Sequence, residues 1–194
     1  MPHADAALVT IRDYRESDAD GWVTCRVLSF VQTQYYDDVK PSRTRLPDGA
    51  IELVAVADGG RIVGILDIEV DGAEATIDSV AVRPGWQHAG VATRLLSHAL
   101  VVLEGRGVRT LDAWTREDAA ANRWYQRNGF AETTRYLHVY LGDGDDPSDF
   151  TTPDGLSSPV TVFVHGRIED EADLRARYRR VYVCRRYARD LTVR

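Results

Sequence analysis

The chain has 194 residues, of which 44% are hydrophobic and 28% charged, so it can bury one sizeable core and is too apolar to be fully disordered. Its net charge of −6 disfavours broad nucleic-acid binding, which needs clustered cations. Because no apolar stretch reaches the roughly 18 residues of a membrane span and no secretory leader is recognisable, we expect a cytoplasmic protein that uses no membrane.

The first elements in the chain are predicted to be a short strand and a helix. The strand is expected over 8–14 and the helix over 19–31, with Ser17 or Asp18 as the residue that caps its N-terminus. A polar stretch with two prolines follows at 35–48, and it predicts a loop that could cover a substrate.

Residues 51–70 give the clearest hairpin signal in the sequence. Two apolar, β-branched runs flank a D-G-G turn at 58–60, and glycine readily adopts the positive φ that such turns need. A second D-G turn at 71–72 leads into a third run over 74–82. The pattern predicts an antiparallel meander of three strands.

The middle of the chain is predicted to alternate helices and strands. Apolar residues recur at helical spacing after the glycine-bearing segment RPGWQHAG. The expected elements are a helix over 90–104, a strand over 108–114, a helix over 117–128 ending at Gly129, and a strand over 130–141. The strands 74–82 and 108–114 are expected to pair in parallel, because a helix connects them.

The C-terminal part begins with an acidic loop at 142–159, rich in proline, glycine and serine. A strand at 160–166, a helix at 170–178 and a strand at 180–187 are expected after it. The sequences of the 130–141 and 180–187 strands look alike, so these two strands could be neighbours in the sheet.

Two cysteines, Cys25 and Cys184, are the only thiols in the sequence. They lie far apart, without a C-x-x-C spacing or a nearby histidine pair, so neither a disulfide framework nor a zinc site is indicated. We expect two free thiols in the core and no bound metal.

The segment from Val80 to Thr93 joins a strand to a helix through a turn that contains Pro84 and two glycines. Such a turn directs backbone N–H groups into one concavity at the positive end of the helix dipole. Small residues at Ala89 and Gly90 would let phosphate oxygens approach the backbone. The segment therefore predicts a site for a diphosphate. Neither a P-loop nor a Rossmann fingerprint is present, which disfavours ATP and NAD.

The stretch VAVRPGWQHAGVATRLL at 80–96 resembles the acetyl-CoA signature of the GNAT superfamily of N-acetyltransferases. Its residues 87–92 match the [RQ]-x-x-G-x-[GA] core of that signature. A second stretch, AANRWYQRNGF at 120–130, resembles the later family motif of a helix with an aromatic-tyrosine pair followed by Gly-Phe. The resemblance covers about 8–141.

This resemblance implies that the cofactor is acetyl-CoA. The end of the strand would bind the pantetheine arm through its backbone, the following amides would hold the pyrophosphate, and His88 would lie at the cofactor rim. Asn122 could bind a pantetheine amide or could equally face solvent or cap its helix. The implied cofactor residues are Val80, Ala81, Val82, Gln87, His88, Ala89, Gly90, Val91, Ala92, Thr93 and Asn122.

Two residues are candidates for catalysis. Tyr125 falls where the family places a tyrosine near the CoA sulfur, and its phenol could protonate the departing thiolate. A cationic amine must lose a proton before it attacks, so a carboxylate is useful, with Asp78 as the first candidate and Glu69 and Glu52 behind it. A tyrosine packed in the core and a solvent-facing aspartate are the structural alternatives.

The expected function is direct transfer of an acetyl group to a primary amine of a small molecule or peptide. The alternatives are a protein N-terminal or lysine acetyltransferase, a CoA-binding regulatory or scaffold module without turnover, and an interaction module carried by 142–194. A homodimer through the C-terminal strands is possible, since strands there often pair between subunits in the family.

The expected fold is α+β, with a mostly antiparallel, splayed sheet of about seven strands and helices on both faces. Residues 1–141 would form the acetyltransferase core and 142–159 the acidic loop. Residues 160–194 would add strands and a helix that complete the same domain.

Overall fold

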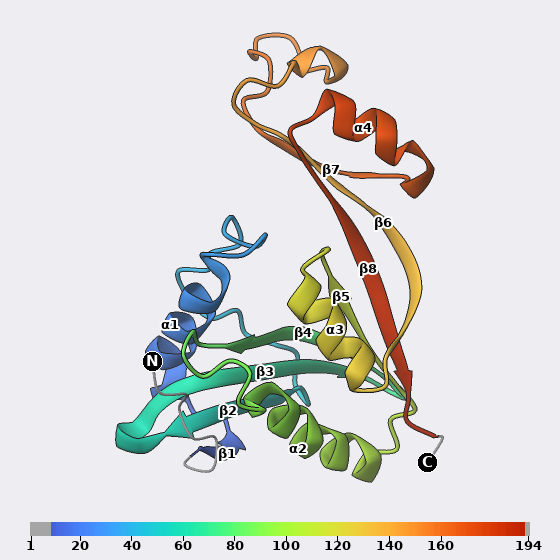
Figure 1. Cartoon of the computed structure of the whole chain (residues 1–194). Helices are drawn as coiled ribbons and strands as arrows, with labels where there is room; N and C mark the ends of the chain where they lie inside the picture. The colour runs from blue at the N-terminus through green and yellow to red at the C-terminus, as the bar shows by residue number, and fades with distance from the viewer. Residues whose placement is uncertain (1–8, 193–194) are drawn as a thin grey trace. The chain divides into compact units, whose positions relative to one another are not determined.

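The computed structural model describes residues 9–192, which divide into two compact units (Figure 1). The first unit contains the chain up to Ala113, residues 127–130 and the end of the chain from Ala188. The second contains residues 114–126 and 131–187. The predicted first strand began at Leu8, which lies outside the described residues, as does most of the stretch searched for a leader.

Eight strands and four α-helices occur in the described residues, close to the sheet of about seven strands expected. Each of the eight segments that the sequence predicted as a strand forms one. In chain order the elements are β1 (Thr10–Asp13), α1 (Ala19–Phe30), β2 (Ile51–Ala57), β3 (Arg61–Asp71), β4 (Glu74–Val82), α2 (Val91–Gly105), β5 (Thr110–Thr115), α3 (Ala119–Arg127), β6 (Ala131–Leu141), β7 (Val162–Gly166), α4 (Glu171–Arg177) and β8 (Arg180–Asp190).

Within the first unit the strands follow the order β1-β2-β3-β4-β5. The pairs from β1 to β4 are antiparallel, which confirms the predicted meander. Residues 74–77 of β4 pair in parallel with residues 110–113 of β5, as the connecting helix predicted. Gly59 and Gly60, with φ of 75° and 76°, make the turn between β2 and β3.

Helices cover both faces of the first unit's sheet, as expected from the buried run of residues 62–68 in β3. On one face Trp22 and Cys25 of α1 pack against Val54 and Ile65. On the other face a Cβ added to Gly64 would lie 2.8 Å from Val91 Cγ1 of α2, so glycine permits a close helix–sheet approach. Figure 1 shows α1 and α2 on opposite sides of these strands.

In the second unit the strand order is β8-β6-β7, which confirms that the two similar sequences form neighbouring strands. Strands β6 and β7 are antiparallel, with Leu137 opposite Gly166 and Leu141 opposite Val162. A small core joins β6 and β8 to α4. Its buried members are Leu137, Val139, Leu141, Tyr178, Val181 and Val183.

The start of α1 differs from the expected cap. Asp18 occupies the N-cap position, but its carboxylate accepts hydrogen bonds from Arg12 Nη1 at 2.6 Å and from the Arg15 backbone N–H at 2.8 Å. No side-chain cap of the helix is formed there. A guanidinium from the neighbouring strand forms a charge-assisted bond with this carboxylate, the stronger kind of partner.

Both cysteines are buried and free, as expected. Across residues 9–192, no helix is both long and apolar enough to cross a membrane. The same residues contain no group of three or more histidine, cysteine, aspartate or glutamate side chains placed to hold a metal ion.

Candidate functional site

The turn between β4 and α2 is held by two short-range hydrogen bonds. The Trp86 N–H donates to the Arg83 carbonyl at 3.0 Å, and Gln87 Nε2 donates to the Val82 carbonyl at 3.0 Å. The Gln87 side chain thus fastens the turn to the end of the strand. This role positions the loop, while the predicted contact of Gln87 with a cofactor stays a prediction.

Gly90 is the N-cap residue of α2 and adopts a left-handed conformation, with φ of 79°. Having no side chain, it leaves the first-turn amides without a side-chain cap. A Cβ added at Gly90 would meet no atom within 4 Å, so open space lies directly before the helix. An exposed helix N-terminus with glycine at the N-cap position is suited to bind phosphate oxygens.

A shallow hollow lies beside this helix start, between β1 and the first two turns of α2. Arg94 and His98 line it from the helix, and Thr10 and Ile11 line it from the strand. Arg94 Nη2 donates to the Val9 carbonyl at 2.7 Å, which ties the helix to the chain before β1. The guanidinium adds positive charge next to the amide-rich end of α2.

The three strand residues predicted to bind pantetheine lie at the end of β4. Val80, Ala81 and Val82 pair with Leu66, Ile65 and Gly64 of β3. The Ala81 side chain is part of the core that contains Trp22, so only its backbone can serve a ligand. The burial of the Ala81 side chain leaves it no role in binding a ligand, and the backbone contact of residues 80–82 with pantetheine stays a prediction.

His88 is an exposed residue of this turn and the only non-glycine with positive φ among the described residues, at 63°. This conformation costs a side-chain-bearing residue about 1 kcal/mol. We expect His88→Gly to raise the free energy of unfolding by up to about 1 kcal/mol and His88→Val to lower it by a similar amount. Urea denaturation of both variants measures this, and a destabilised glycine variant would contradict the expectation.

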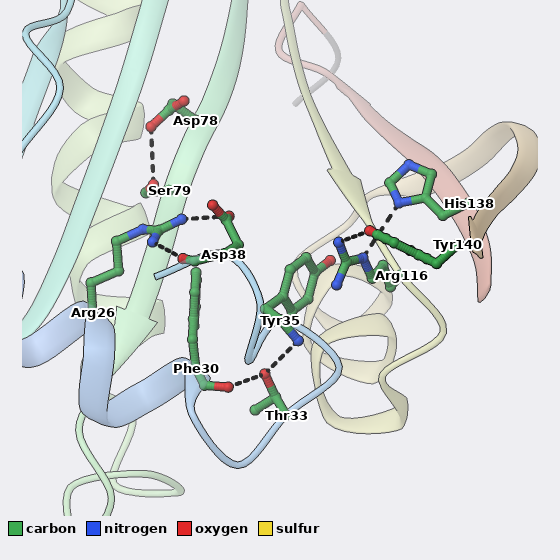
Figure 2. Close-up of polar contacts among 10 residues, drawn as sticks. All are labelled: Arg26, Phe30, Thr33, Tyr35, Asp38, Asp78, Ser79, Arg116, His138 and Tyr140. Atoms are coloured by element: carbon green, nitrogen blue, oxygen red, sulfur yellow. Dashed lines mark hydrogen bonds and ion pairs between the residues drawn. The ribbon is translucent and has the colours of Figure 1, made fainter. Parts of the chain in front are cut away.

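Asp78, the first candidate for a catalytic base, is an exposed residue of β4. Its carboxylate accepts a hydrogen bond from the buried Ser79 hydroxyl at 2.9 Å (Figure 2). Glu69 of β3 is also exposed, whereas the Glu52 carboxylate forms an ion pair with Arg43. Of the three predicted carboxylates, Asp78 is the one on the strand whose end leads into the Gly90 turn.

A fourth carboxylate, Asp67 of β3, was not among the predicted bases. It is 1% exposed, accepts a hydrogen bond from Trp22 Nε1 at 2.9 Å and lies 3.3 Å from Arg43 Nη2. Burial raises the pKa of Asp67 to about 6, although the Arg43 charge acts in the opposite direction. Asp67 lies opposite Ser79 in the β3–β4 pairing.

Arg43 connects this carboxylate to the 35–48 loop. Its guanidinium lies 3.9 Å from the Tyr14 ring centroid, besides its ion pairs with Glu52 and Asp67. Burial raises the pKa of Tyr14. At the other end of the loop, the buried Arg26 of α1 binds the Asp38 carboxylate at 2.6 Å (Figure 2). Two arginines therefore anchor a loop that contains no helix or strand of its own.

Tyr125 and Asn122, the remaining predicted residues, lie on α3 in the second unit. Tyr125 is 4% exposed, and its ring stacks on Tyr187 of β8 with 5.4 Å between centroids and 11° between planes. The Tyr187 hydroxyl donates to Asn122 Oδ1 at 2.8 Å. The two predicted residues are thus joined through one tyrosine.

Asn122 uses its amide within α3 and the turn before it. Its Nδ2 donates to the carbonyls of Arg116 and Asp118 at 2.8 Å and 2.6 Å. Asp118 Oδ1 in turn accepts from the Ala121 N–H at 2.7 Å, which caps the first turn of α3. Asp118 is therefore the cap of α3, and Asn122 ties the helix that carries Tyr125 to the turn before it. The predicted contact of Asn122 with pantetheine stays a prediction.

Comparison with known proteins matches the middle of the chain to an acetyltransferase family model and to a curated acetyltransferase. Residues 49–132 match the family model described as an acetyltransferase (GNAT) domain. The [ribosomal protein bS18]-alanine N-acetyltransferase of Escherichia coli K12 is 41% identical over 68 residues, which are 34% of this chain and 46% of that protein. The chain's match thus spans less than half the length of this curated relative.

Solved structures share the fold across nearly the whole chain. An N-acetyltransferase from Staphylococcus aureus Mu50 superposes with a TM-score of 0.64 at 15% identity, over 94% of this chain and 98% of that one. A GNAT family acetyltransferase from Elizabethkingia anophelis, with acetyl-CoA bound, gives a TM-score of 0.55 at 12% identity over the same shares. At these identities the likeness establishes the fold.

Proposed function

We propose that this chain is an acetyltransferase that moves an acetyl group from acetyl-CoA directly to a primary amine, because its residues 49–132 match the GNAT acetyltransferase family model. The observation that carries this proposal is the turn from β4 into α2, where left-handed Gly90 opens the helix N-terminus to space. The amides of residues 88–93 would hold the pyrophosphate there, and the backbone of residues 80–82 would bind the pantetheine arm. Acetyl-CoA would supply an activated thioester.

Two side chains are proposed to handle protons. Tyr125 would donate its phenolic proton to the leaving thiolate, and its stacking on Tyr187 would hold the ring in one orientation. Asp78 would accept a proton from the incoming ammonium group, directly or through water. Its hydrogen bond from Ser79 fixes the carboxylate on β4.

Calorimetric titration of the full chain with acetyl-CoA tests the cofactor site. We expect Gly90→Trp to weaken binding by about tenfold or more, because an indole would fill the space in front of the helix amides and each lost tenfold corresponds to about 1.4 kcal/mol. Gly59→Trp is the matched control. Gly59 has nearly the same φ, 75°, and the same open surroundings, but it lies in the β2–β3 turn.

The two glycine variants separate a blocked site from a strained backbone. Weak binding by both variants would point to a general effect of backbone strain. Tight binding by Gly90→Trp would contradict the proposed pyrophosphate site at the start of α2. Acetyl transfer to a panel of primary amines then distinguishes an enzyme from a CoA-binding module without turnover. Binding without transfer to any amine would support the second.

A protein N-terminal amine is a second candidate acceptor. It is favoured by the 41% identity, over 68 residues, to an enzyme named for acetylating an alanine of ribosomal protein bS18. A peptide with a free N-terminal alanine and the same peptide with a blocked N-terminus give the test. Acetylation of the free peptide at a higher kcat/KM than that of small amines would select the protein acceptor.

A further inference from the structure

The 35–48 loop is fastened to the first unit by the buried side chain of Arg43. The loop contains no helix or strand, and most residues from 39 to 45 are exposed. Only 9% of the Arg43 side chain is exposed. A long charged side chain from an exposed segment is therefore buried among other parts of the chain, and its contacts decide how firmly the loop is held.

The Arg43 guanidinium contacts two carboxylates and two aromatic rings. It pairs with the Glu52 carboxylate of β2 and lies 3.3 Å from the Asp67 carboxylate of β3. Its Cζ atom lies 3.9 Å from the ring centroid of Tyr14 and 5.5 Å from that of Trp22 in α1. Glu52 and Asp67 are opposite each other in the β2–β3 pairing, so their side chains lie on the same face of the sheet. One side chain of the loop thus contacts four segments that are separate in the sequence.

These ion pairs hold the loop more firmly than exposed ion pairs would. Asp67 is buried, and solvent and salt screen a buried pair less than an exposed one. Arginine keeps its charge and can bond to more than one carboxylate oxygen. Removal of Arg43 would leave Asp67 buried beside Glu52 without this guanidinium, which is costly. The closed loop and the charged form of Asp67 therefore support each other.

The attachment of Arg43 lies next to the proposed base on β4. Ser79 is opposite Asp67 in the β3–β4 pairing. The next pair joins Ile77 to Ile68, so Asp78 has no place in the register and forms a bulge. Asp78 and Ser79 together oppose Asp67, and a bulge of this kind redirects a side chain. The loop is thus fastened one strand away from the carboxylate proposed to take the acceptor's proton.

The two ends of the exposed segment 39–45 are fastened separately from Arg43. Before it, the Asp38 carboxylate binds the buried Arg26 of α1 at 2.6 Å (Figure 2). After it, the Leu46 side chain is buried. Release of Arg43 would therefore free the segment between Asp38 and Leu46 while both of its ends stay attached to the unit.

We propose that Arg43 is a positioning residue for the amine acceptor: its ion pairs with Glu52 and Asp67 hold the 35–48 loop closed on the sheet beside Asp78, and their release opens the loop so that the acceptor can exchange. This role rests on the proposed acetyl transfer. A closed loop keeps water away from a bound acceptor and holds the acceptor in one orientation. An ion pair suits such a latch, because it can break while the apolar core stays packed.

NMR relaxation of backbone ¹⁵N nuclei in the full chain tests the latch without a substrate. We expect order parameters of about 0.85 for residues 42–45 of the unchanged chain, as in rigid backbone, and below about 0.6 in Arg43→Gln. Glu52→Gln, which removes one charge from a half-buried side chain and keeps its shape, should lower the order parameters less. Because this second variant leaves Asp67 paired with Arg43, it tests the latch even if Arg43→Gln does not fold.

Steady-state kinetics test whether the latch serves the acceptor. Arg43→Gln should raise the KM of the amine about tenfold or more with little change in kcat, the pattern of lost binding. Its calorimetric affinity for acetyl-CoA should stay unchanged, since Arg43 contacts β2 and β3 and not the turn into α2. Arg45→Gln is the matched control. Arg45 belongs to the same loop, but its side chain is 90% exposed and lies 3.6 Å from the exposed Asp48.

Each measurement has an outcome that contradicts the proposal. Equal order parameters in Arg43→Gln and Arg45→Gln, or a loop that is already mobile in the unchanged chain, would overturn the latch. A mobile loop in Arg43→Gln with an unchanged KM of the amine, or with an equal loss of affinity for acetyl-CoA, would overturn the role in positioning the acceptor. If no amine is acetylated, the proposed function fails, whereas the relaxation measurement still decides whether Arg43 holds the loop closed.

Discussion

Replacing Tyr125 by phenylalanine is expected to lower kcat by about a hundredfold to ten-thousandfold, the range that a positioned acid or base contributes. The substitution removes one hydroxyl and keeps the ring that stacks on Tyr187 at 5.4 Å. The fold and the affinity for acetyl-CoA should therefore change little. The loss would fall on the chemical step, in which the departing thiolate needs a proton.

Steady-state kinetics with acetyl-CoA and an amine acceptor, together with calorimetric binding, give the measurement. Tyr187→Phe is the matched control, because it removes a neighbouring hydroxyl that donates to Asn122 at 2.8 Å. If Tyr125 acts only by packing, both variants should lose activity to a similar, small extent. A Tyr125→Phe enzyme with unchanged kcat would exclude the general-acid role.

The parts of the fold that were predicted well depend on local chemistry. The glycine turns at 58–60 and 71–72 separate the strands of the meander, and Gly90 and Gly129 adopt positive φ where α2 begins and α3 ends. Such signals are contained in a few adjacent residues, so they can be read without knowing the tertiary structure. The turn from β4 into α2, which we propose to bind phosphate, belongs to this class.

The residues that sequence reasoning missed depend on contacts between distant segments. Asp67 stands in the apolar run IVGILDIEV, which could have marked it as a buried carboxylate, but nothing local indicates that Trp22 and Arg43 bind it. The hydrogen bond from Tyr187 to Asn122 likewise joins residues that are remote in sequence. The end of β8 extends to Asp190, beyond the predicted Tyr187, where Leu191 donates its N–H to the Arg109 carbonyl at 2.8 Å.

The buried Asp67 should make the stability of the chain depend on pH with a sign opposite to that of most carboxylates. Its pKa is about 6 in the folded chain, against 3.8 for an ordinary aspartate, so the folded state binds this proton more readily than the unfolded state. The contribution of Asp67 to the free energy of unfolding is therefore largest below about pH 4. It falls as the pH rises toward 6 and stays at its lowest value above that. A shift of this size corresponds to about 3 kcal/mol.

Asp67→Asn removes this titration and isolates it from the rest of the chain. The free energy of unfolding of the variant, relative to the unchanged protein, should rise by about 3 kcal/mol between pH 4 and pH 7. Carboxylates with lowered pKa, such as Asp18 beside Arg12, contribute the opposite slope equally in both proteins and cancel in the difference. Denaturant unfolding across this pH range gives the measurement, with Asp48→Asn, at a side chain 99% exposed, as the control that should show no such trend. A difference independent of pH would mean that Trp22 and Arg43 hold Asp67 charged in the folded chain, and its burial would then be fully offset by these two partners.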